Sequence, residues 1–224
     1  MNGNGFQSVI DTSDVFLAAI RDTLVMTLVS LVFAGVIGLA LGLVLYATRP
    51  GNLLGNRAVY TVVNVLVNVV RPIPFVIFLA AIAPLSRVAV QTTIGVPAVT
   101  FAISLAASFA VSRIVEQNLL AVDPGVVEAA RASGAHPVSI LLTVLIPEGV
   151  GPLILGYTFI FVGIVDMTAQ GALIGGGGLG EYAIVYGSQR YDWWIVYVSV
   201  AAIVVIVQLG QFIGNRLARA TLRR

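Results

Sequence analysis

The stretch LVMTLVSLVFAGVIGLALGLVLYA, from Leu24 to Ala47, decides what kind of protein this chain is. Thr27 and Ser30 are its polar interruptions. A helix needs about 20 mostly apolar residues to cross the hydrocarbon core of a bilayer. This run exceeds that length, and it therefore predicts a transmembrane helix.

The composition of the whole chain agrees with that interpretation. Hydrophobic residues make up 58% of the 224 residues and charged residues 10%, whereas soluble domains carry roughly 25% charged residues. A second long apolar run extends from Trp193 to Ile213. We therefore expect an all-α integral membrane protein, a helical bundle embedded in the bilayer.

The apolar runs predict five crossings. The bundle would occupy residues 17–216, after a short segment 1–16 and before a basic tail 217–224. The run from Val138 to Ile146 is too short to span the membrane, so it must lie at an interface or lead into the fourth crossing. The five crossings are expected at Ala18–Ala47, Ala58–Leu85, Ile94–Val115, Val150–Gln170 and Trp193–Arg216.

Arginine placement predicts the orientation, because cytoplasmic loops carry an excess of basic residues. One set of loops and ends holds eight arginines and the other three, with Arg71 inside the second crossing. The richer side should be cytoplasmic, which places the N-terminus outside, the C-terminus inside and the loop 116–148 in the cytoplasm. The eight are Arg49, Arg57, Arg113, Arg131, Arg216, Arg219, Arg223 and Arg224; the three are Arg21, Arg87 and Arg190.

Residue types that are missing exclude several functions. The chain has no cysteine, so disulfides and thiolate chemistry are excluded, and its single histidine, His136, cannot form a usual zinc site alone. It also has no lysine, which a Walker A loop needs to reach nucleotide phosphates. We expect no catalytic, cofactor-binding or metal-binding residue here, and any ATP and Mg²⁺ would be bound by a separate subunit.

The loop between the third and fourth crossings contains its own helix signals. Asp123 and Pro124 suit the N-cap and first position of a helix, and Gly134 suits its C-terminal cap. A second helix is expected from Pro137 to a break before Pro147. From composition alone this is a solvated surface helix between two crossings. Its small side chains also suit close approach by a partner, and Glu128 and Arg131 can pair with each other or with that partner.

The spacing in this loop resembles a known motif. Glu128-Ala129-Ala130, three residues, Gly134, nine residues and Val144-Leu145-Ile146-Pro147 resemble the EAA loop of binding-protein-dependent ABC importer permeases. Val144 and Ile146 are conservative departures from that pattern. The resemblance implies that the loop is a coupling helix seated in a cleft of a separate ATPase. The implied coupling residues are Glu128, Ala129, Ala130, Arg131, Gly134 and Pro147.

The rest of the chain looks most similar to the permease subunits of methionine importers. The stretches that carry this resemblance include RDTLVMTLVS, NVVRPIPFVI and IGGGGLGEYAIVYGSQRYD. It implies a type I permease with five transmembrane helices in a bacterial cytoplasmic membrane, which carries L-methionine and, as a further expectation, D-methionine. The implied partners are a second copy, two ATPase subunits and an extracytoplasmic binding lipoprotein, with no nucleic acid.

Polar residues inside the crossings are costly in lipid and suggest functional positions. Arg71, followed by Pro72 and Pro74, indicates either a kinked helix or a gate hinge, and Asn64 and Asn68 should face the bundle interior. Asp166 and Gln170 share a helix face in DMTAQ, where methionine-importer permeases commonly have GYSAM. Asp166 is expected to face the pathway or dimer axis; the alternative is an ion pair with Arg71 or Arg190. The tentative pathway residues are Asp166, Gln170, Arg71 and Pro74.

Three other functions stay open on the sequence. The same fold could carry another amino acid or a quaternary-amine osmolyte. A proton-coupled secondary transporter would be supported by inverted repeats, which the chain lacks. A membrane hydrolase would need a catalytic constellation at membrane depth.

Two further features concern packing: Ala34, Gly38 and Gly42 form a small-residue ridge, and the glycines at 175–178 and 180 indicate a re-entrant turn.

Overall fold

The computed structural model describes residues 7–222, and every regular element in that range is helical. Four stretches are long and apolar enough to cross a membrane: α2 (Ser13–Thr48), α6 (Gly95–Leu120), the run Pro137–Ile174 and α11 (Trp193–Leu222). A fifth crossing arises if the bent pair α3 (Arg57–Val70) and α4 (Phe75–Ala81) counts as one. The predicted all-α membrane bundle is confirmed.

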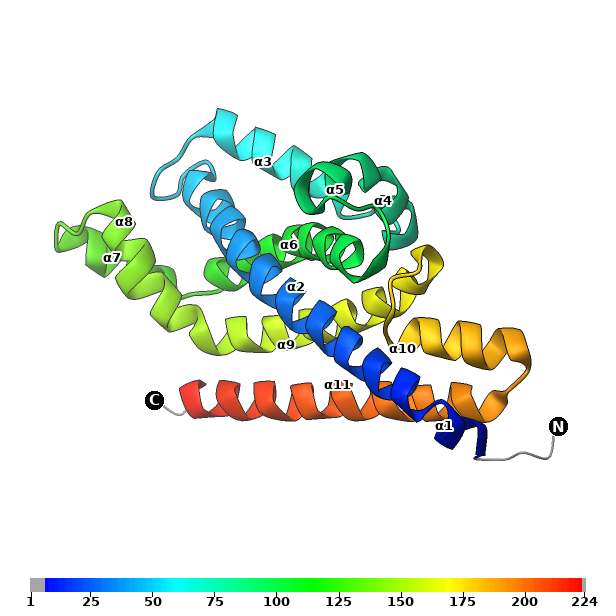
Figure 1. The fold of residues 1–224 in the computed structure, drawn as a ribbon. Coiled ribbons are helices and arrows are strands. Elements are labelled where there is room, and N and C mark those ends of the chain that lie inside the picture. The colour runs from blue at the N-terminus through cyan, green and yellow to red at the C-terminus, as the bar shows by residue number, and fades with distance from the viewer. Residues whose placement is uncertain (1–6, 223–224) are drawn as a thin grey trace.

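The bundle is organised around α2 and α6, which form the most extensive contact between two of its helices (Figure 1). The predicted small-residue ridge makes this close approach possible. A Cβ at Gly38 would lie 2.4 Å from Cβ of Val111, and one at Gly42 would lie 2.5 Å from Cβ of Val115. Only glycine lets the two backbones come this close.

The fourth and fifth crossings lie side by side (Figure 1). The run Pro137–Ile174 consists of α8 (Pro137–Ile140), the π-helix η1 (Leu141–Leu145), α9 (Ile146–Gln170) and the 3₁₀ helix η2 (Gly171–Ile174). Gly214 of α11 faces Thr158 of α9, where a Cβ would lie 2.0 Å from the threonine hydroxyl. Glycine again sets the distance between two helices.

The second crossing differs from the continuous helix expected at Ala58–Leu85. The chain bends by 110° between α3 and α4, and a separate helix α5 (Ala83–Val90) follows. Pro72 and Pro74 explain the break, because proline lacks a backbone N–H and its ring clashes with the preceding turn. The kink expected at this place is therefore present, but it divides the crossing into separate helices.

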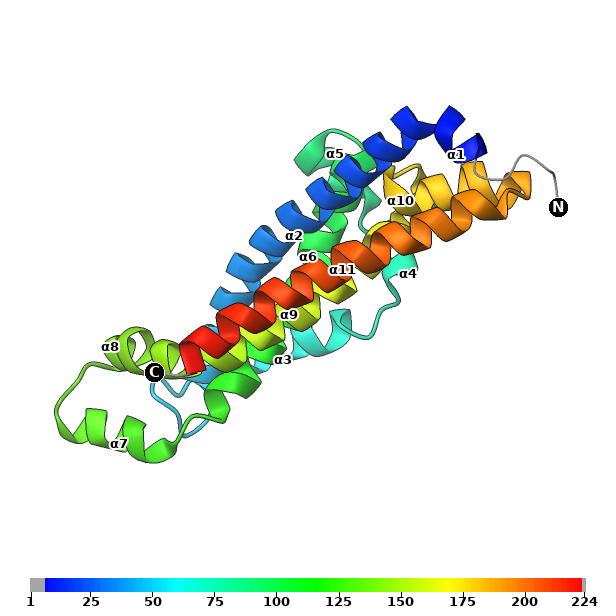
Figure 2. The same cartoon turned by 90° about the horizontal axis from the view of Figure 1, so that it is seen from below.

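The two ends of the bundle carry different features (Figure 2). α7 (Pro124–Ala132) and α8 lie at the end where α11 finishes, and α1 (Gln7–Asp11) lies at the opposite end. α11 continues as a helix to Leu222, through most of the segment expected as a basic tail. The two ends of the described chain thus lie on opposite sides of the bundle, as an odd number of crossings requires. Which side is cytoplasmic stays a prediction.

The glycine cluster forms a tight turn at the α1 end of the bundle, between η2 and the short helix α10 (Gly178–Glu181). Gly175, Gly177 and Gly178 have positive φ angles of 63°, 73° and 78°, which glycine adopts without steric cost. The backbone N–H of Leu179 donates to the hydroxyl of Thr23 in α2 at 2.8 Å. The turn is thereby fastened to the first crossing. The helices η3 (Tyr182–Gly187) and η4 (Ser188–Arg190) lead from it to α11.

Candidate functional site

The helix α7 is defined at both ends by local capping. The carboxylate of Asp123 accepts from the backbone N–H of Gly125 at 2.8 Å. At the other end, the N–H of Gly134 donates to the carbonyl of Arg131 and that of Ala135 to the carbonyl of Ala130. With φ of 76° at Gly134, these two bonds form a Schellman motif. The helix predicted from Asp123 to Gly134 is confirmed.

One face of α7 packs on the bundle and the other faces outward. Val127 is buried and Ala130 half-buried, both within the main hydrophobic cluster that also holds Tyr46 of α2. Glu128, Ala129 and Arg131 are exposed. The side chains of Glu128 and Arg131 do not pair within the described residues. Both charges are therefore available to another protein.

Pro147 lies in the second position of α9 rather than after a break. The expectation of a helix end before Pro147 is wrong, because the chain is helical without interruption from Pro137 to Ile174. The turn before the proline widens into the π-helix η1, in which the N–H of Ile146 donates to the carbonyl of Leu141. Such a π-turn makes room for a proline whose missing N–H would otherwise disturb an α-helix.

Arg71 and Pro74 lie in the break between α3 and α4. The backbone N–H of Arg71 donates to Val67, and the carbonyl of Pro74 accepts from Ile77 and Phe78 at the start of α4. Both residues are exposed. Among residues 7–222 the guanidinium of Arg71 makes no hydrogen bond or ion pair, so the pairing of Asp166 with Arg71 that the sequence left open is absent.

Asp166 and Gln170 lie together on an exposed face of α9. The amide nitrogen of Gln170 donates to Oδ2 of Asp166 at 2.9 Å, and Asp166 forms no ion pair with a described residue. The same face carries Phe159, which is 74% exposed, and Gly163, where an added Cβ would meet no atom within 4 Å. This face of α9 is not covered by the rest of the chain.

The register of α9 against α6 gives the depth of Asp166. Gly171, the first residue of η2 after α9, packs on Val99 of α6, and Gly156 of α9 packs on Ile114. Because the helices are antiparallel, Asp166 lies about level with Ser104. At 1.5 Å per residue, that is about 14 Å inside the end of α6. An exposed carboxylate at this depth requires water or a protein partner, since lipid would penalise it.

Sequence reasoning missed a polar cluster where α2, α3 and α6 meet. Arg113 of α6 donates to Oδ1 of Asn64 at 2.8 Å and to Oδ1 of Asn68 at 2.7 Å, both in α3. It also pairs with Glu116. These bonds show that both asparagines face α6, but Asn68 is exposed and Asn64 half-buried, so the interior position is confirmed only in part. Arg113 counts only as a loop charge in the topology prediction, although its spacing from Glu116 is a usable signal.

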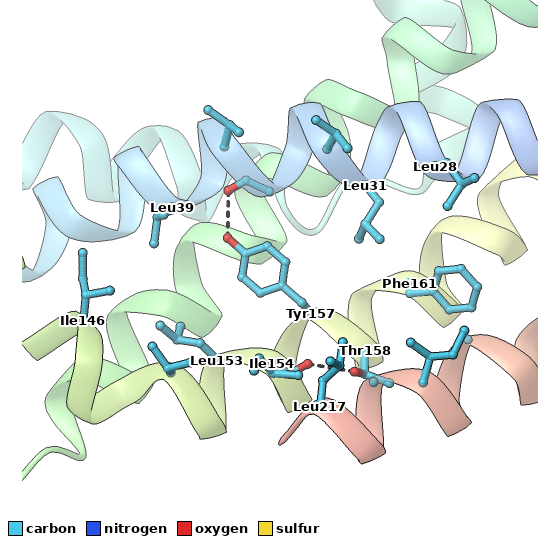
Figure 3. A pocket seen from close by; sticks show the side chains of 17 residues that line it. Leu28, Leu31, Leu39, Ile146, Leu153, Ile154, Tyr157, Thr158, Phe161 and Leu217 are labelled. Atoms are coloured by element: carbon cyan, nitrogen blue, oxygen red, sulfur yellow. Dashed lines mark hydrogen bonds between the residues drawn. The ribbon is translucent and has the colours of Figure 1, made fainter. Parts of the chain in front are cut away.

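An apolar groove of about 730 Å³ lies between α2, α9 and α11 (Figure 3). Its lining includes Leu31, Leu153 and Phe161, and the hydroxyl of Tyr157 inside it donates to the carbonyl of Gly35 at 2.8 Å. The groove carries neither the coupling residues nor Asp166. Its lining is almost entirely apolar, so it is not a polar binding site.

The structure thus separates the predicted site residues into groups. The predicted coupling residues gather at one end of the bundle. Most lie on or beside α7, namely Glu128, Ala129, Ala130, Arg131 and Gly134, and Pro147 lies near the start of the fourth crossing. Asp166 and Gln170 lie in the opposite half of that crossing, while Arg71 and Pro74 mark the break in the second.

Comparison with known sequences gives consistent matches. Residues 36–224 match the family described as binding-protein-dependent transport system inner membrane component. The chain is 37% identical over 207 residues to the probable D-methionine transport system permease protein MetI of Vibrio cholerae, covering 92% of each chain. It is 39% identical over 157 residues to the D-methionine transport system permease protein MetI of Escherichia coli strain K12, covering 70% of this chain and 72% of that one.

Solved structures agree. A structure of inward-facing conformations of the MetNI methionine ABC transporter matches with a TM-score of 0.91 and 37% identity, over 94% of this chain and 98% of the other. The fold is also similar to that of an amino acid ABC transporter, with a TM-score of 0.80 and 21% identity, over 96% and 98% of the two chains. The second similarity concerns the fold alone.

Proposed function

The chain belongs to the family of binding-protein-dependent transport system inner membrane components, and from this premise we propose that it is the permease subunit of a methionine ABC importer. As a member of this family it is a multi-pass protein of a bacterial inner membrane. The observation that carries the proposal is α7: a capped surface helix with outward charges, in a chain that resembles methionine permeases over 92% of its length.

The proposed energy source lies outside this chain. With no lysine in its sequence, the chain lacks the residue with which a P-loop holds nucleotide phosphates. ATP and Mg²⁺ would be bound by two ATPase subunits, each receiving one α7 from a homodimer of the permease. Glu128 and Arg131 would contact the ATPase, while Gly134 and Pro147 shape the loop. α7 would then be on the cytoplasmic side, as the arginine distribution predicts.

The proposed pathway runs along the exposed face of α9. Two copies facing each other would place their Asp166 and Gln170 side chains on a shared water-filled path, which removes the cost of an exposed carboxylate in lipid. The depth of Asp166 and the uncovered surface at Gly163 support this arrangement. The break at Arg71–Pro74 supplies a hinge by which α3 and α4 could open the path. An extracytoplasmic binding protein would deliver the substrate.

Reconstitution tests the proposed function. The permease is purified with its ATPase, placed in liposomes and supplied with the binding protein and labelled L- or D-methionine. The proposal predicts methionine uptake that requires ATP, and ATP hydrolysis stimulated by the methionine-loaded binding protein. If another amino acid or a quaternary amine stimulated ATP hydrolysis instead, that compound and not methionine would be the substrate. Uptake driven by a proton gradient without ATP would indicate a secondary transporter and contradict the proposal.

A further inference from the structure

The polar cluster between α2, α3 and α6 is more than a helix contact. We name Arg49, Asn64, Asn68, Arg113 and Glu116 the Arg113 network. Arg113 uses Nη2 for both asparagines of α3 and Nη1 for Oε2 of Glu116, at 2.5 Å. Asn68 also donates to Asn64 at 3.3 Å. One guanidinium thus joins two helices through three partners, and its planar fork fixes the directions of these bonds more rigidly than a flexible ammonium would.

Burial makes the network costly to rearrange. The side chain of Glu116 is 2% exposed and that of Arg113 is 14% exposed. Oε1 of Glu116 has no hydrogen-bond partner among the described residues, and Nη1 of Arg49 lies 3.9 Å from it. Removing one partner of a buried ion pair leaves an uncompensated charge. Glu116 therefore holds Arg113 in the orientation that reaches α3.

The helix α3 has few other attachments. Val67 is its only buried residue, and Val62, Val65 and Val69 are exposed on its outer side. Hydrophobic burial therefore fixes α3 less firmly than it fixes α2 or α6. The bonds from Arg113 reach α3 at two successive turns, just before the break at Arg71. They determine how α3 follows α6.

The end of α6 that carries Arg113 and Glu116 leads directly into α7. Glu116 lies four residues before Leu120, the last residue of α6, and Asp123 then caps α7. Leu119 of α6 and Val127 of α7 belong to one buried cluster. A displacement of α7 must therefore move the end of α6 that carries Arg113, and cores of this density transmit such shifts.

We propose that Arg113 is a positioning residue that transmits displacement of α7 to the broken second crossing. Glu116 orients its guanidinium, and Asn64 and Asn68 receive the movement on α3, whose far end is the hinge at Arg71–Pro74. The inference rests on the proposed function, because it takes an ATPase to displace α7. In this proposal Arg113 acts through the helices that it joins, by its bonds to Asn64, Asn68 and Glu116.

Distance measurements between spin labels test the inference without substrate. Because the chain has no cysteine, single substitutions Val62→Cys on α3 and Ala121→Cys beside α7 each give one distance across the dimer in the complete transporter, once any cysteines of the partner subunits have been replaced. In the otherwise unchanged chain, ATP binding should alter both distances. In Arg113→Gln the Ala121 distance should still respond, whereas the Val62 distance should not. An unchanged response at Val62 would overturn the proposal.

Two further variants guard against misfolding and non-specific effects. The pair Asn64→Ala and Asn68→Ala removes the acceptors but keeps the buried Arg113–Glu116 pair, and it should also abolish the response at Val62. Arg57→Gln, which removes an exposed arginine at the start of α3, should leave that response intact. If the asparagine variant responds normally, or the Arg57 control loses its response, the assignment to this network is overturned.

Transport measurements complete the test. Arg113→Gln should lower ATP-dependent uptake at least about fivefold, the range of ordinary coupling between sites. Adding the two asparagine substitutions should lower it no further, since the residues act as one unit. Additive losses would contradict the network. Failure of the proposed function would give a different result from failure of the network. The Ala121 distance would then not change on ATP binding even in the unchanged chain, and both proposals would be overturned.

Discussion

At the scale of single residues, Gly134 is the position where backbone conformation most directly shapes the coupling loop. Its φ of 76° lies in the left-handed region and no atom lies within 4 Å of an added Cβ, so the cost of substitution is conformational. Gly134→Ala should destabilise the cap by about 1–2 kcal/mol, which corresponds to amide exchange about 5- to 30-fold faster. Hydrogen exchange at residues 134 and 135 measures it.

The matched variant for this prediction is Gly134→Asn. Asparagine tolerates the left-handed region better than alanine does, so its amides should exchange at a rate between those of the glycine and alanine forms. Equal exchange in all three would mean that the Schellman bonds do not depend on this conformation.

Asp166 provides a second prediction at the residue scale. Asp166→Asn keeps the side-chain shape but removes the charge from the exposed face of α9, and loss of a charge-assisted contact costs about 1.5 kcal/mol or more. ATP-dependent methionine uptake should therefore fall about tenfold. Asp14→Asn, an exposed change outside the predicted crossing, is the control. Unchanged transport and ATP hydrolysis in Asp166→Asn would remove Asp166 from the pathway.

The residues that sequence could predict are those whose role is local. Asp123 and Gly134 act within a few positions of themselves, so capping rules located both. Arg113 acts across 45 and 49 positions, on Asn68 and Asn64. Nothing in the spacing near Arg113 indicates those partners. Whether Asp166 pairs with Arg71 or Arg190 cannot be predicted from the sequence either, because it depends on how the crossings pack.

At the scale of elements, the contact between α2 and α6 is set by glycine. A Cβ at Gly38 would lie 2.4 Å from Cβ of Val111 and 2.8 Å from the carbonyl oxygen of Ser108. Gly38→Ala should destabilise the permease by about 1–3 kcal/mol through overpacking, seen as a lower midpoint of thermal unfolding in detergent. Gly163→Ala, which meets no atom within 4 Å, should have little effect.

A compensating substitution sharpens this test. Val111→Ala removes the γ-carbons that crowd position 38, but it leaves Cβ and the Ser108 carbonyl in place. The double variant should therefore be less destabilised than the sum of the two single variants. Strict additivity would indicate that the helices move apart rather than clash at this point.

Element boundaries were predictable where composition alone decides them. The crossings at α2, α6, α9 and α11 follow from uninterrupted apolar length, and each starts or ends within several residues of its expected position. Pro147 and the pair Pro72 and Pro74 illustrate the limit. All three were expected to disrupt a helix, yet the π-turn η1 absorbs Pro147, whereas α3 and α4 separate completely. The outcome depends on the packing around each proline.

At the scale of the whole molecule, the orientation in the membrane is the open prediction. Ser133→Cys beside α7 and Gln189→Cys at the opposite end are both exposed positions in a chain without cysteine. A membrane-impermeant maleimide added to intact cells should label Gln189→Cys only. Ser133→Cys should react once the membrane is opened. The reverse pattern would place α7 outside and contradict both the arginine distribution and the coupling role.

The central claim is that α7 is where the ATP cycle of another subunit acts on this permease. The most direct measurement compares ATP-dependent methionine uptake by liposomes holding the complete transporter, unchanged or with Glu128→Arg. Reversing an interface charge costs several kcal/mol, so uptake should fall at least about tenfold while the permease still inserts in the membrane. Normal ATP-dependent uptake by Glu128→Arg would contradict the account.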